Sequence, residues 1–197
     1  MEISAQMVKE LREQTGAGMM DCKKALTEAG GNFDKAVTVL REKGIAKAAS
    51  KEGRSTSEGV VASYIHPGDK LGVMVEINCE TDFVARTDEF KALARDIAMQ
   101  IAATNPQAVS RDGLNQELVA KEREILKHQT ENEKKPAAVI DKIVDGRMEK
   151  YYSEVVLLEQ PFVKDNDKTV QDIVTEKVAK IGENIQVKRF VRFRLGE

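Results

Sequence analysis

The feature that most constrains this sequence is a change of hydrophobic period across residues 79–85. Residues 71–79 alternate apolar and outward-facing positions, and this period of two predicts a half-buried strand. From Phe90 to Ile101 the apolar residues recur at helical spacing instead, which predicts a long helix over about 88–103. Apolar positions of the strand pattern are Val73, Val75, Ile77 and Cys79. The chain must therefore turn from a strand into a helix within a few residues.

The connection between these two elements carries an acid, Asp82, beside a large ring, Phe83. Strand-to-helix connections are normally polar and lie on the surface. Phe83 therefore either folds back onto the core or is held out for a partner. Spacing alone favours the core, because a lone aromatic side chain is usually buried.

The first 50 residues predict three short helices. Ser4 can cap the first helix, which Gly16 or Gly18 ends, and Gly30-Gly31 ends the second. Asn32 can cap the third helix, for which Gly44 supplies a stop. We therefore expect a three-helix domain over residues 1–44 and a linker over 45–57, where small, basic and Ser/Thr residues follow one another.

The remainder, residues 58–197, predicts an α+β domain. Alternating residues from Val60 to His66, the turn Pro67–Lys70 and the strand over 71–79 form a hairpin. Alternation returns from Ile185 to Leu195, so we expect a small antiparallel three-stranded sheet flanked by helices. The fold class is thus α+β, with a helical domain before the sheet.

Residues 113–152 predict a charged helical insertion into this domain. A thin apolar stripe runs through the first half, from about 113 to 130, and a helix of the kind that projects or pairs as a coiled coil carries such a stripe. Its residues are Leu114, Leu118, Ile125 and Leu126. The run Glu131–Pro136 predicts a turn before a second helix over 137–152, and an Asp/Asn/Lys loop leads to a helix capped by Thr169.

Composition excludes several classes of function. The 197 residues hold 31 Lys and Arg against 33 Asp and Glu, a net charge of −2, so overall charge indicates neither nucleic-acid nor membrane binding. No apolar run approaches the length that spans a bilayer, and the start Met1–Ser4 does not resemble a signal peptide. Cys22 and Cys79 are expected to be buried free thiols. We therefore expect a cytoplasmic protein.

No pattern argues for bond chemistry. His66 and His128 belong to no metal or nucleophile motif, so we expect no catalytic residue, no metal and no cofactor. The Gly16–Gly18 run follows a helix and lacks the lysine of a phosphate loop. Apart from Phe83, one apolar feature needs an explanation: adjacent Met19 and Met20 point about 100° apart, so one of them either widens the core face or contacts a partner.

Two long segments resemble the signatures of translation elongation factor Ts. One runs from Leu11-Arg12 through Thr15–Leu26, and the other is Glu76–Ala85. Gly146–Met148, Gln160–Val163 and Ile181–Ile185 are similar to further segments of that family. The resemblance covers the chain from end to end, and the two signatures occur in the family's order.

This resemblance implies a fold, a partner and a site. The first 44 residues would form a ubiquitin-associated-like domain, and the partner would be the GTPase elongation factor Tu, from which the family promotes GDP release so that GTP can rebind. Thr81, Asp82, Phe83 and Val84 would disturb the partner's Mg²⁺ and phosphate region. Arg12, Gly18, Met19 and Met20 would contact its G domain. The exposed position of Phe83 becomes the favoured one.

The chain resembles the short bacterial form, of which some members function as homodimers. Its last predicted strand contains no cysteine, so we expect no interchain disulfide there. One alternative function is an RNA- or ribosome-binding adaptor that uses Lys47, Lys51, Arg54 and the basic last strand. Another is a hydrolase that uses Asp82 and His66, which no nucleophile motif supports. Direct nucleic-acid binding and membrane binding are not expected.

Overall fold

The computed structural model describes residues 3–131 and 136–197, and these fall into two compact units. The first unit comprises Met1–Gly59, Asn78–Ala85 and Asp172–Gln186. The second comprises Val60–Ile77, Arg86–Gln171 and Val187–Glu197. Helices and a small antiparallel sheet are combined, so the predicted α+β class is confirmed.

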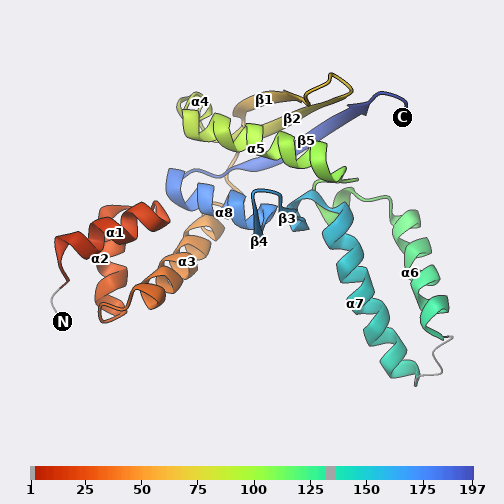
Figure 1. The fold of residues 1–197 in the computed structure, drawn as a ribbon, viewed down its shortest axis with the longest axis horizontal. Coiled ribbons are helices and arrows are strands. Elements are labelled where there is room, and N and C mark those ends of the chain that lie inside the picture. The colour runs from red at the N-terminus through yellow and green to blue at the C-terminus, as the bar shows by residue number, and fades with distance from the viewer. Residues whose placement is uncertain (1–2, 132–135) are drawn as a thin grey trace. The chain divides into compact units, whose positions relative to one another are not determined.

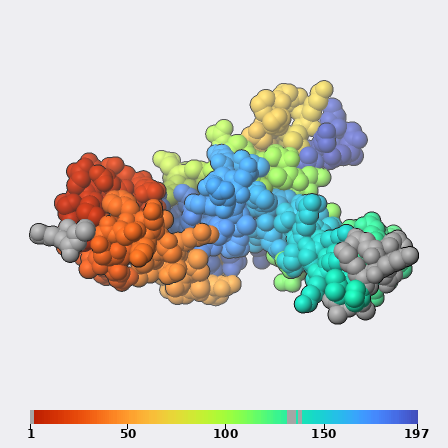
Figure 2. Space-filling view, turned by 60° about the horizontal axis from the view of Figure 1, so that its bottom comes forward, coloured from red at the N-terminus to blue at the C-terminus, as the bar shows by residue number. Residues whose placement is uncertain are grey.

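Three helices open the first unit: α1 (Ala5–Thr15), α2 (Met19–Glu28) and α3 (Phe33–Ala49) (Figures 1 and 2). Both predicted N-caps are present, because Ser4 Oγ accepts from the Met7 amide and Asn32 Oδ1 accepts from the Lys35 amide. We call these three helices the head. Its small core consists of Val8, Leu11, Cys22, Ala25, Leu26 and Ala36.

The third helix does not end at Gly44, as the sequence predicted, but continues to Ala49. Gly44 instead allows a close approach of α8 (Val170–Ile181): a Cβ added at Gly44 would lie 3.5 Å from the Cβ of Ala179. The absence of a side chain therefore serves packing here, and not helix termination. The domain boundaries at 44 and 57 stay predictions.

The three-stranded sheet has the order β1 (Glu58–Ile65), β2 (Leu71–Cys79), β5 (Gln186–Arg194). The predicted hairpin turn joins β1 to β2, with the Leu71 carbonyl accepting from the His66 amide at 2.9 Å. α5 (Asp88–Thr104) follows, with Thr87 Oγ1 as its N-cap, and runs along the sheet (Figure 1). One face of β2 and the apolar stripe of α5 are fully buried: Val73, Val75, Ile77, Phe90, Leu93, Ile97 and Ile101.

The predicted helical insertion consists of α6 (Gln116–Glu131) and α7 (Ala137–Val155), between the short helices η1 (Arg111–Gly113) and η2 (Leu157–Glu159). α6 and α7 pack side by side (Figure 1) around Ile140, Val144, Met148, Val119 and Leu126. The predicted stripe of α6 was partly wrong, because Leu118 and Ile125 are exposed and Val119 packs instead. The turn predicted over Glu131–Pro136 lies largely outside the described residues.

A second, two-stranded sheet was not predicted. β3 (Pro161–Phe162) pairs antiparallel with β4 (Asp165–Thr169), where the polar composition indicated a loop. Buried Gln100 fixes β3 beside α5, since its amide group donates to the Pro161 carbonyl at 3.1 Å and accepts from the Val163 amide at 2.8 Å. Tertiary hydrogen bonds thus override local propensity here. Among the described helices, none is long and apolar enough to span a bilayer.

Candidate functional site

We call residues Thr81–Val84 the tip. Thr81 precedes α4 (Asp82–Ala85), and the other three residues of the tip lie within it. This single helical turn packs through buried Ala85. Phe83 is 80% exposed, whereas Thr81, Asp82 and Val84 are half-buried. The expectation from spacing, that Phe83 belongs to the core, is therefore wrong. Ala85 is the buried residue of this turn, and Phe83 points away from the core.

The tip is held by the carboxylate of Glu183, which comes shortly after α8. One oxygen accepts from the backbone amides of Glu80 and Thr81, at 3.2 and 3.1 Å. The other oxygen accepts from the Thr81 hydroxyl at 2.7 Å. Hydrogen bonds to a charged acceptor are stronger than those between neutral groups. The backbone just before Phe83 is therefore fixed although Phe83 itself is exposed.

Glu80 forms the reciprocal half of this junction. Its carboxylate accepts from the Asn184 backbone amide at 2.7 Å and lies 3.5 Å from a guanidinium nitrogen of Arg54. The Asn184 side chain in turn donates to the Arg54 carbonyl at 3.0 Å. The Asn184 amide, and then the Arg54 charge, hold the pKa of the Glu80 carboxyl below its usual range. Two segments more than a hundred residues apart are thus joined in both directions.

Cys79 closes the junction from inside. It is fully buried, and its thiol donates to the Thr81 carbonyl at 3.2 Å. Burial, and then the nearby Glu183 charge, raise the pKa of this thiol. The thiol is therefore protonated at neutral pH and is a poor nucleophile. Cys79 and Cys22 are both buried free thiols, as the sequence predicted.

The predicted head contacts lie on the same compact unit as the tip. Arg12, Gly18, Met19 and Met20 are all exposed. Met19 is 46% and Met20 63% exposed, so neither methionine widens the core face of the head. Gly18 is the N-cap residue of α2. Together these residues present an apolar surface at the start of α2 and one cation on α1.

Helix α8 contacts the head and then leads to Glu183. The Lys180 side chain passes 3.7 Å from where a Cβ on Gly16 would lie, and Asp172 forms an ion pair with Arg41 at 3.7 Å. The close approach at Gly44 adds a third contact. Within the first unit, the head and the tip therefore share one supporting element.

Several residues of the alternative functions have other partners. Arg54 is engaged by Glu80, and in the last strand Arg189 pairs with Glu76 at 2.7 Å and Arg192 with Glu197 at 3.1 Å. Such pairing reduces the positive charge that nucleic acid would meet. His66 hydrogen-bonds to Tyr64. Within the part of the chain that the structure describes, no group of three or more His, Cys, Asp or Glu residues could hold a metal.

Glu80, Glu183 and Asn184 are the residues that sequence reasoning did not assign. Each lies in a segment that resembles the family, but no local pattern gives it a role. Their contacts join residues 102 to 104 positions apart. Only the folded chain brings them together.

The chain is similar to known proteins along almost its whole length. The family model described as Elongation factor TS matches residues 2–197. "Elongation factor Ts" of Carboxydothermus hydrogenoformans is 65% identical over 195 residues, which is 99% of this chain and 90% of that protein. The proteins of that name from Desulforamulus reducens and Thermoanaerobacter pseudethanolicus are 61% and 60% identical, over 90% and 96% of their own lengths. Matched along almost its whole length, the chain belongs to the elongation factor Ts family of translation elongation factors.

Proposed function

We propose that this chain is a guanine-nucleotide exchange factor that acts by contact on the GTPase elongation factor Tu. It binds the GDP-bound partner and promotes release of GDP by disturbing the partner's Mg²⁺ and phosphate region, after which GTP can bind. One observation carries the proposal: Phe83 is 80% exposed on a backbone that Glu183 holds in place. Exposure of a large ring is costly in water, and a partner that buries the ring removes the cost.

Burial of Phe83 in the complex would contribute a substantial part of the free energy that nucleotide exchange requires. Burial of a phenylalanine side chain stabilises a complex by about 1.5–3 kcal/mol. A factor that binds the nucleotide-free partner more tightly than the GDP-bound partner must weaken GDP binding by the same free energy, because linkage is reciprocal. Burial of Phe83 therefore supplies part of the coupling if it is complete only in the nucleotide-free complex.

Asp82 has a supporting role in this proposal. Its carboxylate can accept a hydrogen bond from a side chain or a helix N-terminus of the partner. A single carboxylate makes a poor Mg²⁺ site, which needs octahedral coordination. Asp82 would thus move a group that supports the metal and would not bind the metal itself. Thr81 and Val84 complete the tip by fixing its backbone and its apolar edge.

The head supplies affinity. Arg12, Gly18, Met19 and Met20 would contact the G domain of the partner. Methionine suits such a surface, since its flexible thioether adapts to irregular contacts. Nothing in either contact makes or breaks a covalent bond, so the protein would change the partner's nucleotide affinity and would not be an enzyme.

A second copy of this chain is the other partner that we propose. The face of the sheet that α5 does not cover carries six exposed apolar side chains, which we call the outer face: Val61, Ile65, Met74, Val191, Phe193 and Leu195. Contiguous exposed apolar residues mark interfaces. Two such faces would cover each other in a symmetric homodimer, because a two-fold axis pairs the same surface of both subunits.

Substitution of Phe83 tests the exchange function. We expect Phe83→Ala to slow GDP release from elongation factor Tu by about tenfold or more, because up to about 3 kcal/mol of burial is lost. Stopped-flow fluorescence with a labelled GDP measures this rate. Phe83→Leu is the matched control, since it keeps an apolar side chain and should retain most of the activity.

The fold should survive both substitutions, because Phe83 is largely exposed and contributes little to the packing of its own unit. Circular dichroism should give the same thermal midpoint for the three proteins. A wild-type chain that leaves the GDP release rate of elongation factor Tu unchanged contradicts the proposed function. Equal rates for wild type and Phe83→Ala contradict the role of the tip.

A further inference from the structure

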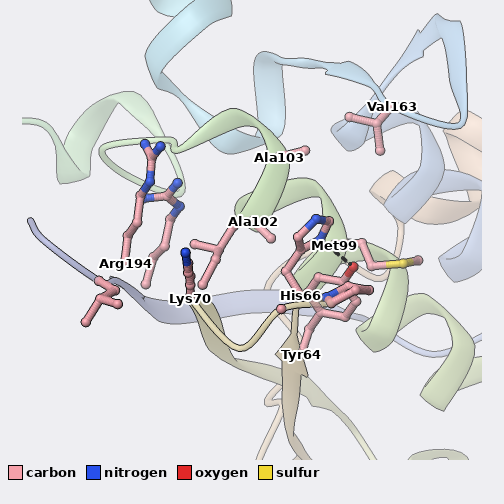
Figure 3. A pocket seen from close by; sticks show the side chains of 13 residues that line it. Tyr64, His66, Lys70, Met99, Ala102, Ala103, Val163 and Arg194 are labelled. Atoms are coloured by element: carbon pink, nitrogen blue, oxygen red, sulfur yellow. Dashed lines mark hydrogen bonds between the residues drawn. The ribbon is translucent and has the colours of Figure 1, made fainter.

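A cavity of about 870 Å³ opens in the second unit, and no residue of the tip or the head lines it. It lies between the hairpin turn, the last turns of α5 and the end of β5 (Figure 3). Its volume is within the range of small-molecule sites. The proposed exchange function does not use this cavity, so it needs a separate explanation.

Three cations line one part of the cavity: Lys70, Arg192 and Arg194. In Figure 3 the side chains of Lys70 and Arg194 extend in the same direction. The single carboxylate that meets the arginines is that of Glu197, 3.1 Å from Arg192 and 3.5 Å from Arg194 among the interactions of the described residues. Three positive charges against one negative charge favour an anion.

Arg192 gives an independent indication of a missing ligand. Its side chain is only 9% exposed, and its Nε is a buried donor with no hydrogen-bond partner in the described part of the chain. A buried donor without an acceptor is costly, and native structures contain few of them. A small shift of the Arg192 side chain would bring this buried donor to an acceptor bound in the cavity that Arg192 lines.

The other walls are apolar and aromatic. Met99, Ala102 and Val163 face the cavity from α5 and from the residue after β3. Tyr64 and His66 also line the cavity, and the Tyr64 hydroxyl lies 3.1 Å from His66 Nδ1 (Figure 3). A ligand that fits both kinds of wall carries an anionic group at one end and an apolar or aromatic group at the other.

We propose that this cavity binds a small organic phosphate, with the phosphate at Lys70, Arg192 and Arg194 and the organic part against Met99, Ala102 and Val163. A phosphate carries up to two negative charges and several acceptor oxygens, which suits one lysine and two arginines better than a single carboxylate does. After a small shift of the Arg192 side chain, Arg192 Nε donates to one of these oxygens. Glu197 competes with the phosphate, because its carboxylate occupies the same two guanidinium groups.

An NMR titration of the full-length chain tests the site with phenyl phosphate as the probe. We expect saturable shifts of the amides of Lys70, Leu71, Ala103, Arg194 and Leu195. Inorganic phosphate should bind the same residues more weakly, which isolates the apolar walls, and phenol should not bind, which isolates the charge. Binding of phenyl phosphate and of inorganic phosphate should weaken as the salt concentration rises, because salt screens the attraction between the phosphate and the three cations.

Three variants and one control variant make the outcome specific. Lys70→Gln and Arg194→Gln alter exposed side chains, so the fold is retained, and each should weaken phenyl phosphate binding about fivefold. Glu197→Gln should strengthen binding about threefold, since the competing charge is lost. Lys188→Gln is the matched control: Lys188 is an exposed lysine of β5 that does not line the cavity, and its loss should change nothing.

Three results would overturn the proposal. The cavity is not a binding site if phenyl phosphate causes no saturable shift of any amide. The phosphate group contributes nothing to binding if phenol binds as tightly as phenyl phosphate. The effect reduces to nonspecific surface charge if Lys188→Gln weakens binding as much as Lys70→Gln.

Discussion

Thr81 is held through its amide and its hydroxyl by one carboxylate, that of Glu183. The same carboxylate accepts from the Glu80 amide. These three donors point at Glu183 because the backbone turns at the end of β2, where it leaves the ladder of the sheet. Hydrogen bonds to a charged acceptor contribute about 1.5–3 kcal/mol each and are not additive. The position of Phe83 therefore depends on a residue that never meets the partner in our proposal.

Substitution of Glu183 should separate the position of the tip from the strength of binding. We expect Glu183→Ala to lower the maximal rate of GDP release about tenfold. Without the Glu183 carboxylate the backbone beside Phe83 is loosely held, and the entropy cost of ordering it in the complex offsets part of the free energy gained by burial of Phe83. Affinity for elongation factor Tu should fall less, because the head is unchanged. Stopped-flow rates and calorimetric affinities, measured on the same protein, distinguish the two effects.

Glu154→Ala is the control for this experiment, because it removes an exposed glutamate from α7. It should leave both quantities unchanged. If Glu183→Ala alters neither the rate nor the affinity, the hydrogen bonds at Glu80 and Thr81 do not position the tip.

The sequence singles out the residues of the tip as a candidate site, whereas their support could not be predicted. Asp82 and Phe83 stand out because an acid and a large ring occur where a strand pattern ends. Exposure of Phe83 contradicts the spacing argument, since the residue of α4 that is buried is Ala85. Glu183 looks like any other surface acid in the sequence, and its role exists only after the chain has folded.

At the scale of elements, the head and α8 form one supporting structure within the first unit. α8 approaches the head closely where Gly16 and Gly44 lack side chains. A helix that is fixed along its length in this way also positions the residues just beyond its C-terminus, which here include Glu183. The head would thus support the tip as well as binding the partner.

The methionines of α2 test the contribution of the head. We expect the double variant Met19→Ala, Met20→Ala to weaken binding to elongation factor Tu about tenfold, because both side chains are exposed and their apolar area would be buried in the complex. The maximal rate of GDP release at saturating protein should change little. Isothermal calorimetry and stopped-flow fluorescence measure the two effects.

Leu118→Ala is the control, because Leu118 is an apolar side chain of similar exposure, 54%, that lies in the second unit and outside the outer face. Its affinity for the partner should equal that of the wild type. An unchanged affinity for the α2 double variant argues against a head contact at these residues.

Elements with a strong period could be predicted well. The strand of residues 71–79 has the bounds of β2, and the helix predicted over 88–103 ends one residue later, at Thr104. The failures have a common cause, since α3 passes through Gly44 and β4 forms from a polar segment only because other parts of the chain pack on them. Local propensity is a weak guide where tertiary contacts decide.

At the scale of the whole molecule, the outer face of the sheet indicates how copies of the chain would associate. Phe193 is 68% exposed and Leu195 77% exposed, at the end of the strand that forms one edge of the sheet. A pair of chains that buries both outer faces removes these side chains from water. The association needs no disulfide, because both cysteines are buried elsewhere.

Light scattering tests this association. We expect the wild-type protein to have the mass of two chains and the Phe193→Asp protein to have the mass of one. An aspartate at this position would bury an unpaired carboxylate in the interface, which is costly. Phe83→Asp is the matched control, since it places the same charge at another exposed phenylalanine, 80% exposed, outside the sheet. It should leave the mass unchanged while slowing GDP release.

A wild-type chain that scatters as a single copy contradicts the homodimer. The same result would leave the exchange function intact, because that function rests on the first unit. Conversely, a Phe193→Asp chain that is single but still releases GDP at the wild-type rate shows that association is not required for exchange.

The hydrogen bonds between Glu183 and Thr81 also set an order of events during synthesis of the chain. A nascent chain that has been made only as far as α4 already contains Phe83, but it lacks the carboxylate that fixes the backbone beside it. Chains are made from the N-terminus, and their early parts fold first. The head can therefore form long before the tip is fastened, and an incomplete copy could bind the partner without being able to release its GDP.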